Sequence, residues 1–165
     1  MQNLNLQTTY LLLGSNLGNR EEILENAIEL IENRVGFVLK RSKFYETAPW
    51  GVDNQPNYLN IAIAVITTLN PNELLIETQQ IEETLGRVRL EKWGARLIDI
   101  DIIFFGEQII NEPTLVIPHP LMHERNFVLV PLEEIAPDFI HPIFHKSIIA
   151  LCNLCADIGE VKPYL

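Results

Sequence analysis

The order in which two hydrophobic patterns follow each other constrains the fold of this chain more than any other feature. Four segments have the alternation or the short apolar runs that are typical of strands: 8–13, 37–46, 58–67 and 97–105. Two segments between them carry apolar residues at helical spacing: 23–31 and 74–85. The chain therefore reads strand, helix, strand, strand, helix, strand, and a C-terminal part with many prolines follows.

Local signals mark the ends of the two expected helices. Asn19 stands three residues before Glu22, which is the spacing of a capping box, and Pro71 suits the first position of a helix. Gly36 and Gly86 are expected to close the two helices.

This order predicts an α+β fold with a ferredoxin-like βαββαβ antiparallel sheet. Right-handed crossovers put both helices on one face of the sheet and leave the other face open. A C-terminal extension of short helices and turns completes the chain. A length of 165 residues predicts one domain that spans residues 1–165.

The last strong strand carries two aspartates. Alternation places Ile98, Ile100, Ile102 and Phe104 against the helices, so that Asp99 and Asp101 project together from the open face. Their Cα atoms are expected to lie roughly 6.6 Å apart. Two ionised carboxylates at this distance repel each other unless a cation lies between them, and carboxylate oxygens suit Mg²⁺. The alternative is a pair of solvated aspartates on an exposed sheet, although Asp is a poor strand former.

The loop before this strand is strongly cationic. It carries Arg87, Arg89, Lys92 and Arg96 together with Trp93, between Gly86 and the acidic strand. Arginine forks next to a metal-binding carboxylate pair suit a polyphosphate. No G-x-x-x-x-G-K-[ST] motif is present, so a nucleotide would be held without a P-loop. The alternative is that these cations balance acidic neighbours in an ordinary loop.

Tyr58 and Asn60 share the open face with the two aspartates, because they alternate with the apolar residues of 58–67. An aromatic ring can stack on a flat heterocycle and an amide can read its edge. A strand tyrosine that merely covers an exposed sheet is the alternative.

Six segments, in order between about residues 8 and 158, resemble the 6-hydroxymethyl-7,8-dihydropterin pyrophosphokinase family. The segment 92–103, which runs from the cationic loop through the two aspartates, is the longest and most specific. The others are Gly14–Gly18, Tyr45–Pro49, Gln55–Asn60, Gly86–Arg89 and Ile117–Pro120.

The resemblance implies that the chain transfers pyrophosphate from MgATP to the hydroxymethyl group of the pterin, releasing AMP, in folate biosynthesis. It implies two Mg²⁺ ions held by Asp99 and Asp101, and ATP as co-substrate. The residues that it implies for catalysis are Arg87, Arg96, Asp99 and Asp101. Those that it implies for ATP binding are Gln79, Glu82, Arg89, Lys92, Trp93, Ile102, His119 and Arg125. Those that it implies for pterin binding are Thr47, Pro49, Trp50, Tyr58, Asn60, Trp93 and Phe127.

Some positions depart from the family pattern. The loop of residues 87–95 is one residue shorter, and Leu90 stands where a lysine is often found. Val116 and Pro120 replace residues that can contact ATP. We expect this loop to be mobile without ligand and ordered over bound ATP and pterin, with these departures weakening its closure.

Histidine and cysteine pairs suggest metal sites only superficially. His119 and His123 are four residues apart, as are His141 and His145, but the prolines between and beside them disfavour the helix that a zinc pair needs. His119 is expected to be a neutral nucleotide contact. The Cys152-x-x-Cys155 pair lies in an apolar helical stripe and is expected to be structural.

Charge and apolar content limit the partners. A net charge of −10 argues against a nucleic-acid-binding face, and no apolar run is long enough to span a membrane. We expect a cytoplasmic monomer that acts on small molecules. Three alternatives remain: a ligand-sensing domain without activity, an RNA-binding sheet, and a two-metal nucleotidyl transferase or hydrolase.

Overall fold

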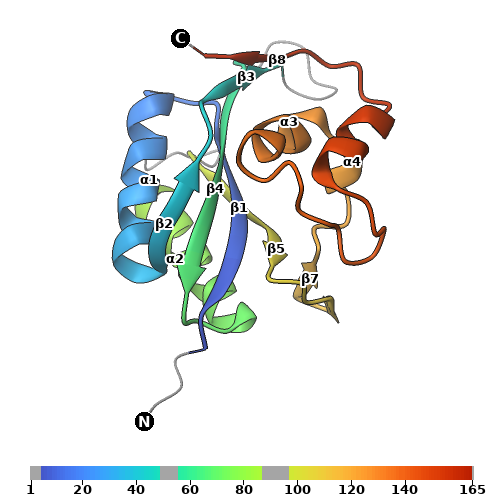
Figure 1. Ribbon diagram of the computed structural model, residues 1–165. Coiled ribbons are helices and arrows are strands. Elements are labelled where there is room, and N and C mark those ends of the chain that lie inside the picture. Colours follow the sequence, from blue (N-terminus) through green and yellow to red (C-terminus); the bar gives the residue numbers. More distant parts are fainter. Residues whose placement is uncertain (1–4, 49–55, 87–96, 165) are drawn as a thin grey trace.

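The computed structural model describes residues 5–48, 56–86 and 97–164, and its centre is an antiparallel sheet (Figure 1). The strands of this sheet are β1 (Gln7–Ser15), β2 (Gly36–Arg41), β3 (Tyr45–Thr47), β4 (Tyr58–Thr67), β5 (Asp99–Phe105) and β8 (Val161–Pro163). Their order is β5-β1-β4-β3-β8, and β2 also pairs with β4. The core order β5-β1-β4-β2/β3 is that of the predicted ferredoxin-like sheet.

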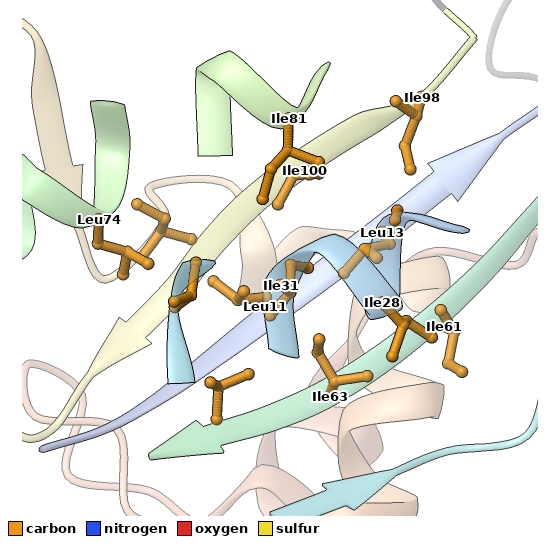
Figure 2. Close-up of a cluster of buried hydrophobic side chains, with 14 of the residues drawn as sticks. Leu11, Leu13, Ile28, Ile31, Ile61, Ile63, Leu74, Ile81, Ile98 and Ile100 are labelled. Atoms are coloured by element: carbon orange, nitrogen blue, oxygen red, sulfur yellow. The ribbon is translucent and has the colours of Figure 1, made fainter. Parts of the chain in front are cut away.

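Two crossover helices, α1 (Arg20–Arg34) and α2 (Pro71–Gly86), cover one face of the sheet (Figure 1). The predicted cap of α1 is confirmed, since Asn19 Oδ1 accepts from the backbone N–H of Glu22 at 3.2 Å, and α2 begins at Pro71 as predicted. Asn70, which was not predicted as a cap, accepts through Oδ1 from the backbone N–H of Glu73 at 2.8 Å. The apolar stripes of both helices pack against the side chains on this face of β1, β4 and β5, and this cluster forms the larger core (Figure 2). The expected placement of both crossover helices on one face is confirmed.

The C-terminal part covers a portion of the opposite face. Helices α3 (Asn126–Ile135) and α4 (Ile148–Leu154) pack there on a second apolar cluster. The sheet residues in this cluster are Leu12, Ala62, Ala64, Ile103 and Phe104. These two helices leave uncovered the end of the sheet that carries the acidic residues of β5.

A hairpin and a short helix connect β5 to α3. The hairpin strands are β6 (Ile110–Glu112) and β7 (Leu115–Ile117), and the 3₁₀ helix η1 spans Met122–Glu124. The backbone N–H of His119 donates to the carbonyl of Ile103 at 3.0 Å, which holds this connection beside β5. Among the helices that the structure describes, none is long and apolar enough to cross a bilayer.

The prediction that Phe104 faces α1 and α2 was wrong. The register between β1 and β5 shifts between Tyr10, which pairs with Phe104, and Leu11, which pairs with Ile102. The unpaired Ile103 is a β-bulge, and a bulge reverses the alternation of the residues beyond it. Phe104 therefore lies in the cluster under α3 and α4, where its ring contacts Phe139 at a centroid distance of 4.5 Å.

The segment 37–46 was expected to be one strand, and the structure divides it. β2 and β3 both pair with β4, but Ser42–Phe44 interrupt them. The backbone N–H of Ser42 still donates to the carbonyl of Ala62 at 2.9 Å, but the N–H of Ala62 donates to Ser42 Oγ at 3.0 Å, so a side chain replaces one backbone acceptor at this break. Before the break, β2 pairs with residues 63–67 of β4. After it, β3 pairs with residues 58–60 of β4, at the uncovered end of the sheet.

Candidate active site

A pocket of about 330 Å³ lies at the end of the sheet that α3 and α4 leave uncovered. Its size is within the range of small-molecule sites in proteins. Its lining residues come from β1, β3, β4, β5 and the start of α3: Leu12, Gly14, Thr47, Ala48, Tyr58, Asn60, Asp99, Asp101, Arg125 and Phe127.

Strand register brings the polar side chains of the pocket together. Gly14 of β1 pairs with Asp99 on one side and with Asn60 on the other, which makes a row across three strands. Leu12 pairs with Asp101 in the next row on the same face. The two aspartates and the amide thus lie on one surface, as alternation predicted, and both aspartates are partly exposed.

Gly14 makes this row possible, and the sequence analysis gave it no role. A Cβ atom at this position would lie 2.5 Å from Asn60 Oδ1 and 3.7 Å from Tyr58 Cδ1. The amide of Asn60 therefore uses the space above the bare backbone of β1. Its Nδ2 donates to Thr47 Oγ1 at 3.3 Å, which joins β3 to β4 at the pocket wall. The sequence signal that could have indicated this close approach is the presence of a glycine at position 14, at the end of a strand.

The start of α3 supplies the opposite wall. Arg125 occupies the N-cap position of this helix and Phe127 follows two residues later. The Arg125 guanidinium carbon lies 5.6 Å from the centre of the Phe127 ring, which is within the range of a cation–π contact. The pocket thus pairs a cation and an aromatic ring from α3 with carboxylates and an amide from the sheet.

Two neighbouring groups are held in their neutral forms. Burial raises the pKa of the Tyr58 phenol, and the negative charge of Asp99 raises it further. Burial lowers the pKa of His119 and nearby Arg125 lowers it too, although Asp101 acts in the opposite direction. His119 Nδ1 accepts from the backbone N–H of Leu121 at 3.2 Å, which leaves Nε2 as the protonated nitrogen of the neutral ring.

Asp99 and Asp101 are the donor set that a hard cation would use here. Among the described residues no group of three or more His, Cys, Asp or Glu side chains could hold a metal ion. Mg²⁺ is commonly bound through one or two carboxylates, with water and substrate phosphates as its other ligands. Two carboxylates on the floor of a solvent-accessible pocket fit that mode of binding.

Four predicted residues lie outside the pocket lining. His119 lies beside β5, near Asp101 and Arg125. Glu82 of α2 accepts from the backbone N–H of Ile100 at 2.9 Å, on the outer edge of β5. The side chain of Ile102 is buried in the core under α1 and α2, and Gln79 is exposed on α2.

The remaining predicted residues lie outside the described part of the chain. They are Pro49, Trp50, Arg87, Arg89, Lys92, Trp93 and Arg96. The expectation of a loop that orders over bound substrates, and the departure at Leu90, concern the same undescribed stretch.

Comparison with known proteins gives a consistent result. Residues 10–137 match the family described as 7,8-dihydro-6-hydroxymethylpterin-pyrophosphokinase. The chain is 41% identical over 143 residues to the 2-amino-4-hydroxy-6-hydroxymethyldihydropteridine pyrophosphokinase of Aquifex aeolicus, covering 87% of this chain and 89% of that protein. It is 48% identical over 127 residues to the enzyme of the same name from Bacillus subtilis, covering 76% of each chain.

Two longer proteins also match. The chain is 43% identical over 159 residues to the folic acid synthesis protein fol1 of Pneumocystis carinii, covering 96% of this chain and only 21% of that protein. The crystal structure of wild-type Plasmodium falciparum HPPK-DHPS with pteroate superposes with a TM-score of 0.77 at 20% identity, over 93% of this chain and 43% of that one. At that identity the superposition supports the fold, and the chain spans a fraction of either longer protein.

Proposed function

Because the chain belongs to the 7,8-dihydro-6-hydroxymethylpterin-pyrophosphokinase family, we propose that the pocket on its sheet is the site of pyrophosphoryl transfer from ATP. The acceptor is the hydroxymethyl oxygen of 6-hydroxymethyl-7,8-dihydropterin, and the reaction belongs to folate synthesis. This oxygen attacks the β-phosphorus of ATP, the bond from that phosphorus to the α-phosphate oxygen breaks, and AMP leaves. The hydroxyl proton is lost in the same reaction.

One observation carries the assignment of the site. Strand register brings Asp99, Asp101 and Asn60 together, and the pocket that they line also contains Tyr58 and, from the start of α3, Phe127. Two carboxylates that could bind a metal-phosphate group, and aromatic and amide groups suited to a flat heterocycle, therefore line the same pocket. A transfer between nucleotide and pterin requires such a combination, because phosphoryl transfer depends on positioning and charge neutralisation.

The pterin would lie against the sheet between Tyr58 and Phe127. Asn60 Oδ1 can accept from an N–H on the pterin edge, because its Nδ2 is already engaged by Thr47. The neutral Tyr58 phenol adds no second negative charge beside Asp99. The family resemblance adds Pro49, Trp50 and Trp93 as further pterin-binding residues.

ATP would be bound through charged groups at its phosphates and through backbone groups at its adenine. Asp99 and Asp101 would hold Mg²⁺, two ions by resemblance, and the bound metal would supply positive charge against the phosphates of ATP. Arg125, which lines the same pocket, would contact a phosphate oxygen, and His119 Nε2 would donate a hydrogen bond without adding charge. Since the Ile102 side chain is buried in the core, an adenine contact there would use its backbone at the outer edge of β5, near Glu82.

The rest of the proposal rests on family resemblance. Arg87 and Arg96 would stabilise the charge on the transferring group, and Gln79, Arg89 and Lys92 would contact ATP. The chain would act as one domain and as a monomer in the cytoplasm.

The direct test is to incubate the protein with MgATP and the hydroxymethyl-pterin and to identify the nucleotide product. We expect AMP in equal amount to the pterin pyrophosphate, and no AMP when the pterin is omitted. Release of pyrophosphate or inorganic phosphate from ATP would instead indicate a nucleotidyl transferase or a hydrolase. Binding of both ligands without any product would indicate a ligand-sensing domain.

A further inference from the structure

Helix α3 carries two residues of the candidate site at its first turn but has no cap of its own. Arg125 is the N-cap residue, and its side chain makes no capping hydrogen bond. The first N–H groups of a helix have no partner within the helix, so a cap normally comes from the preceding side chain. In this chain it comes from Asp157, whose Oδ2 accepts from the backbone N–H of Asn126 at 3.0 Å.

The contact between Asp157 and the start of α3 is reciprocal. The Asn126 side chain donates through Nδ2 to the carbonyl of Asp157 and, at 3.4 Å, to that of Gly159. Asp157 Oδ1 in turn accepts from the backbone N–H of Gly159 at 2.8 Å. A carboxylate beside a helix N-terminus is also favoured by the helix dipole. The segment 157–159 is therefore bound to the start of α3 through both the backbone and the side chain of Asn126.

The same segment continues into the other wall of the pocket. After Gly159 the chain forms β8, which pairs antiparallel with β3 so that Val161 lies opposite Thr47 (Figure 1). Thr47 is thus held between Tyr58 of β4 and Val161 of β8, and its hydroxyl accepts from the Asn60 amide.

A smaller cavity lies between the C-terminal segment 157–161 and the pocket residues Thr47 and Phe127. Its volume is about 40 Å³, and it shares Thr47, Ala48 and Phe127 with the main pocket. Its other side is formed by Asp157, Gly159, Glu160 and Val161. The C-terminal segment therefore backs the wall that Thr47 and Phe127 present to the main pocket. This segment also lies beyond residues 10–137, where the family match ends.

We infer that Asp157 is a positioning residue for the pyrophosphoryl acceptor: it fixes the start of α3, and with it Phe127, relative to Thr47. The inference rests on the proposed function. Asp157 does not line the main pocket, so it acts through the residues that do. Its loss should loosen the pterin side of the site and leave Asp99 and Asp101 on β5 in place.

The test compares Asp157→Ala and Asp157→Asn with Asp138→Asn, which removes the same charge from an exposed position just after α3. We expect Asp157→Ala to raise KM for the pterin about fivefold, the equivalent of a lost helix cap, with KM for ATP nearly unchanged. Asp157→Asn keeps one acceptor oxygen and should recover part of the loss. Asp138→Asn should match the wild type.

Three outcomes would overturn the inference. One is an unchanged pterin KM in both Asp157 variants when the wild type is active. Another is an equal rise in both KM values together with a lower melting temperature, which would show a structural role only. If the wild type makes no AMP, the proposed function fails, and hydrogen exchange then decides: unchanged protection of the amides of residues 126–128 in Asp157→Ala would refute the cap itself.

Discussion

Asp99 and Asp101 are the residues on which the proposed reaction depends most directly, since they face the pocket from one edge strand. Replacing either with Asn should lower kcat for AMP formation by at least about a hundredfold, because metal charge stabilisation contributes several kcal/mol to such transfers. Steady-state assays over a range of Mg²⁺ concentrations measure this. Glu107→Gln, at an exposed turn after β5, is the charge-matched control. Near-normal turnover in both Asp variants would refute the metal assignment.

Gly14 gives a second test at the scale of single atoms. Gly14→Ala places a methyl group 2.5 Å from Asn60 Oδ1, so the amide has to move away from Thr47. We expect a loss of stability of about 1–3 kcal/mol and weaker binding of the pterin than of ATP, measured by denaturation and by isothermal titration. Gly86→Ala is the control for stability, since a Cβ there meets nothing within 4 Å. Unaltered pterin affinity in Gly14→Ala would show that Asn60 does not contact the pterin.

The roles of single residues were predictable where a side chain itself carries the chemistry. Strand alternation was enough to put Asp99, Asp101, Tyr58 and Asn60 on one face, and the structure confirms that placement. Gly14 has no side chain to suggest a role, and its close approach to Asn60 depends on a register that the sequence does not show. Whether these residues bind substrate stays a prediction.

At the scale of elements, the turn between α3 and α4 contains a buried titratable group. His141 is 2% exposed, and its Nδ1 accepts from the backbone N–H groups of Ile143 and Phe144 at 3.1 and 3.2 Å. Burial, together with the smaller effects of the neighbouring His123 and His145, lowers the pKa of His141 to about 4. The folded protein thus holds this imidazole neutral, whereas the unfolded chain protonates it below its ordinary pKa of about 6.5.

Stability should therefore be complete above about pH 6.5 and fall as the pH drops toward 4, because the unfolded state then binds more protons. The expected loss from this group is of the order of 2–3 kcal/mol, measured by denaturant unfolding across that range. His141→Asn keeps an acceptor but cannot titrate, so it should flatten this part of the profile. His145→Asn is the comparison variant: it removes only the smallest of the three causes that lower the His141 pKa, so most of the slope should remain, and Asn tolerates the φ of 57 at this exposed position. An identical slope in wild type and His141→Asn would refute the assignment.

The elements themselves were predictable to different degrees. β4 has the predicted bounds, and both crossover helices begin where Asn19 and Pro71 indicated. The bulge at Ile103 was not predictable because residues 102–105 are all apolar, so no alternation marks a change of face there. β8 was not predicted, because a strand of only three residues is too short to show an alternation pattern in the sequence.

At the scale of the whole molecule, one sheet joins two apolar clusters, so we expect them to unfold together. Ile148 of α4 is fully buried and Ile158 is 99% exposed. Ile148→Ala should cost about 2–5 kcal/mol of unfolding free energy, while Ile158→Ala should stay within about 0.5 kcal/mol of the wild type. Far-UV circular dichroism, which follows all helices and strands, and near-UV circular dichroism, which is sensitive to the packed rings of Tyr10, Phe104 and Phe139 in the second cluster, should give coincident denaturant transitions for Ile148→Ala. Separate transitions would mean that the C-terminal helices unfold independently of the sheet.

The distribution of pocket residues along the chain has a consequence for synthesis. The floor of the pocket begins at Leu12 on β1, and the strand that backs Thr47 ends at Pro163. A nascent chain gains helix α1 early, but β1 has no β5 beside it until residue 105 has left the ribosome, and β3 is unpaired on one side until residue 163 has followed. At about 5–20 residues per second, the interval between these two events is several seconds. During that interval β5 already pairs with β1 while β3 lacks its second neighbour, so the wall that carries Thr47 is the last part of the pocket to be completed.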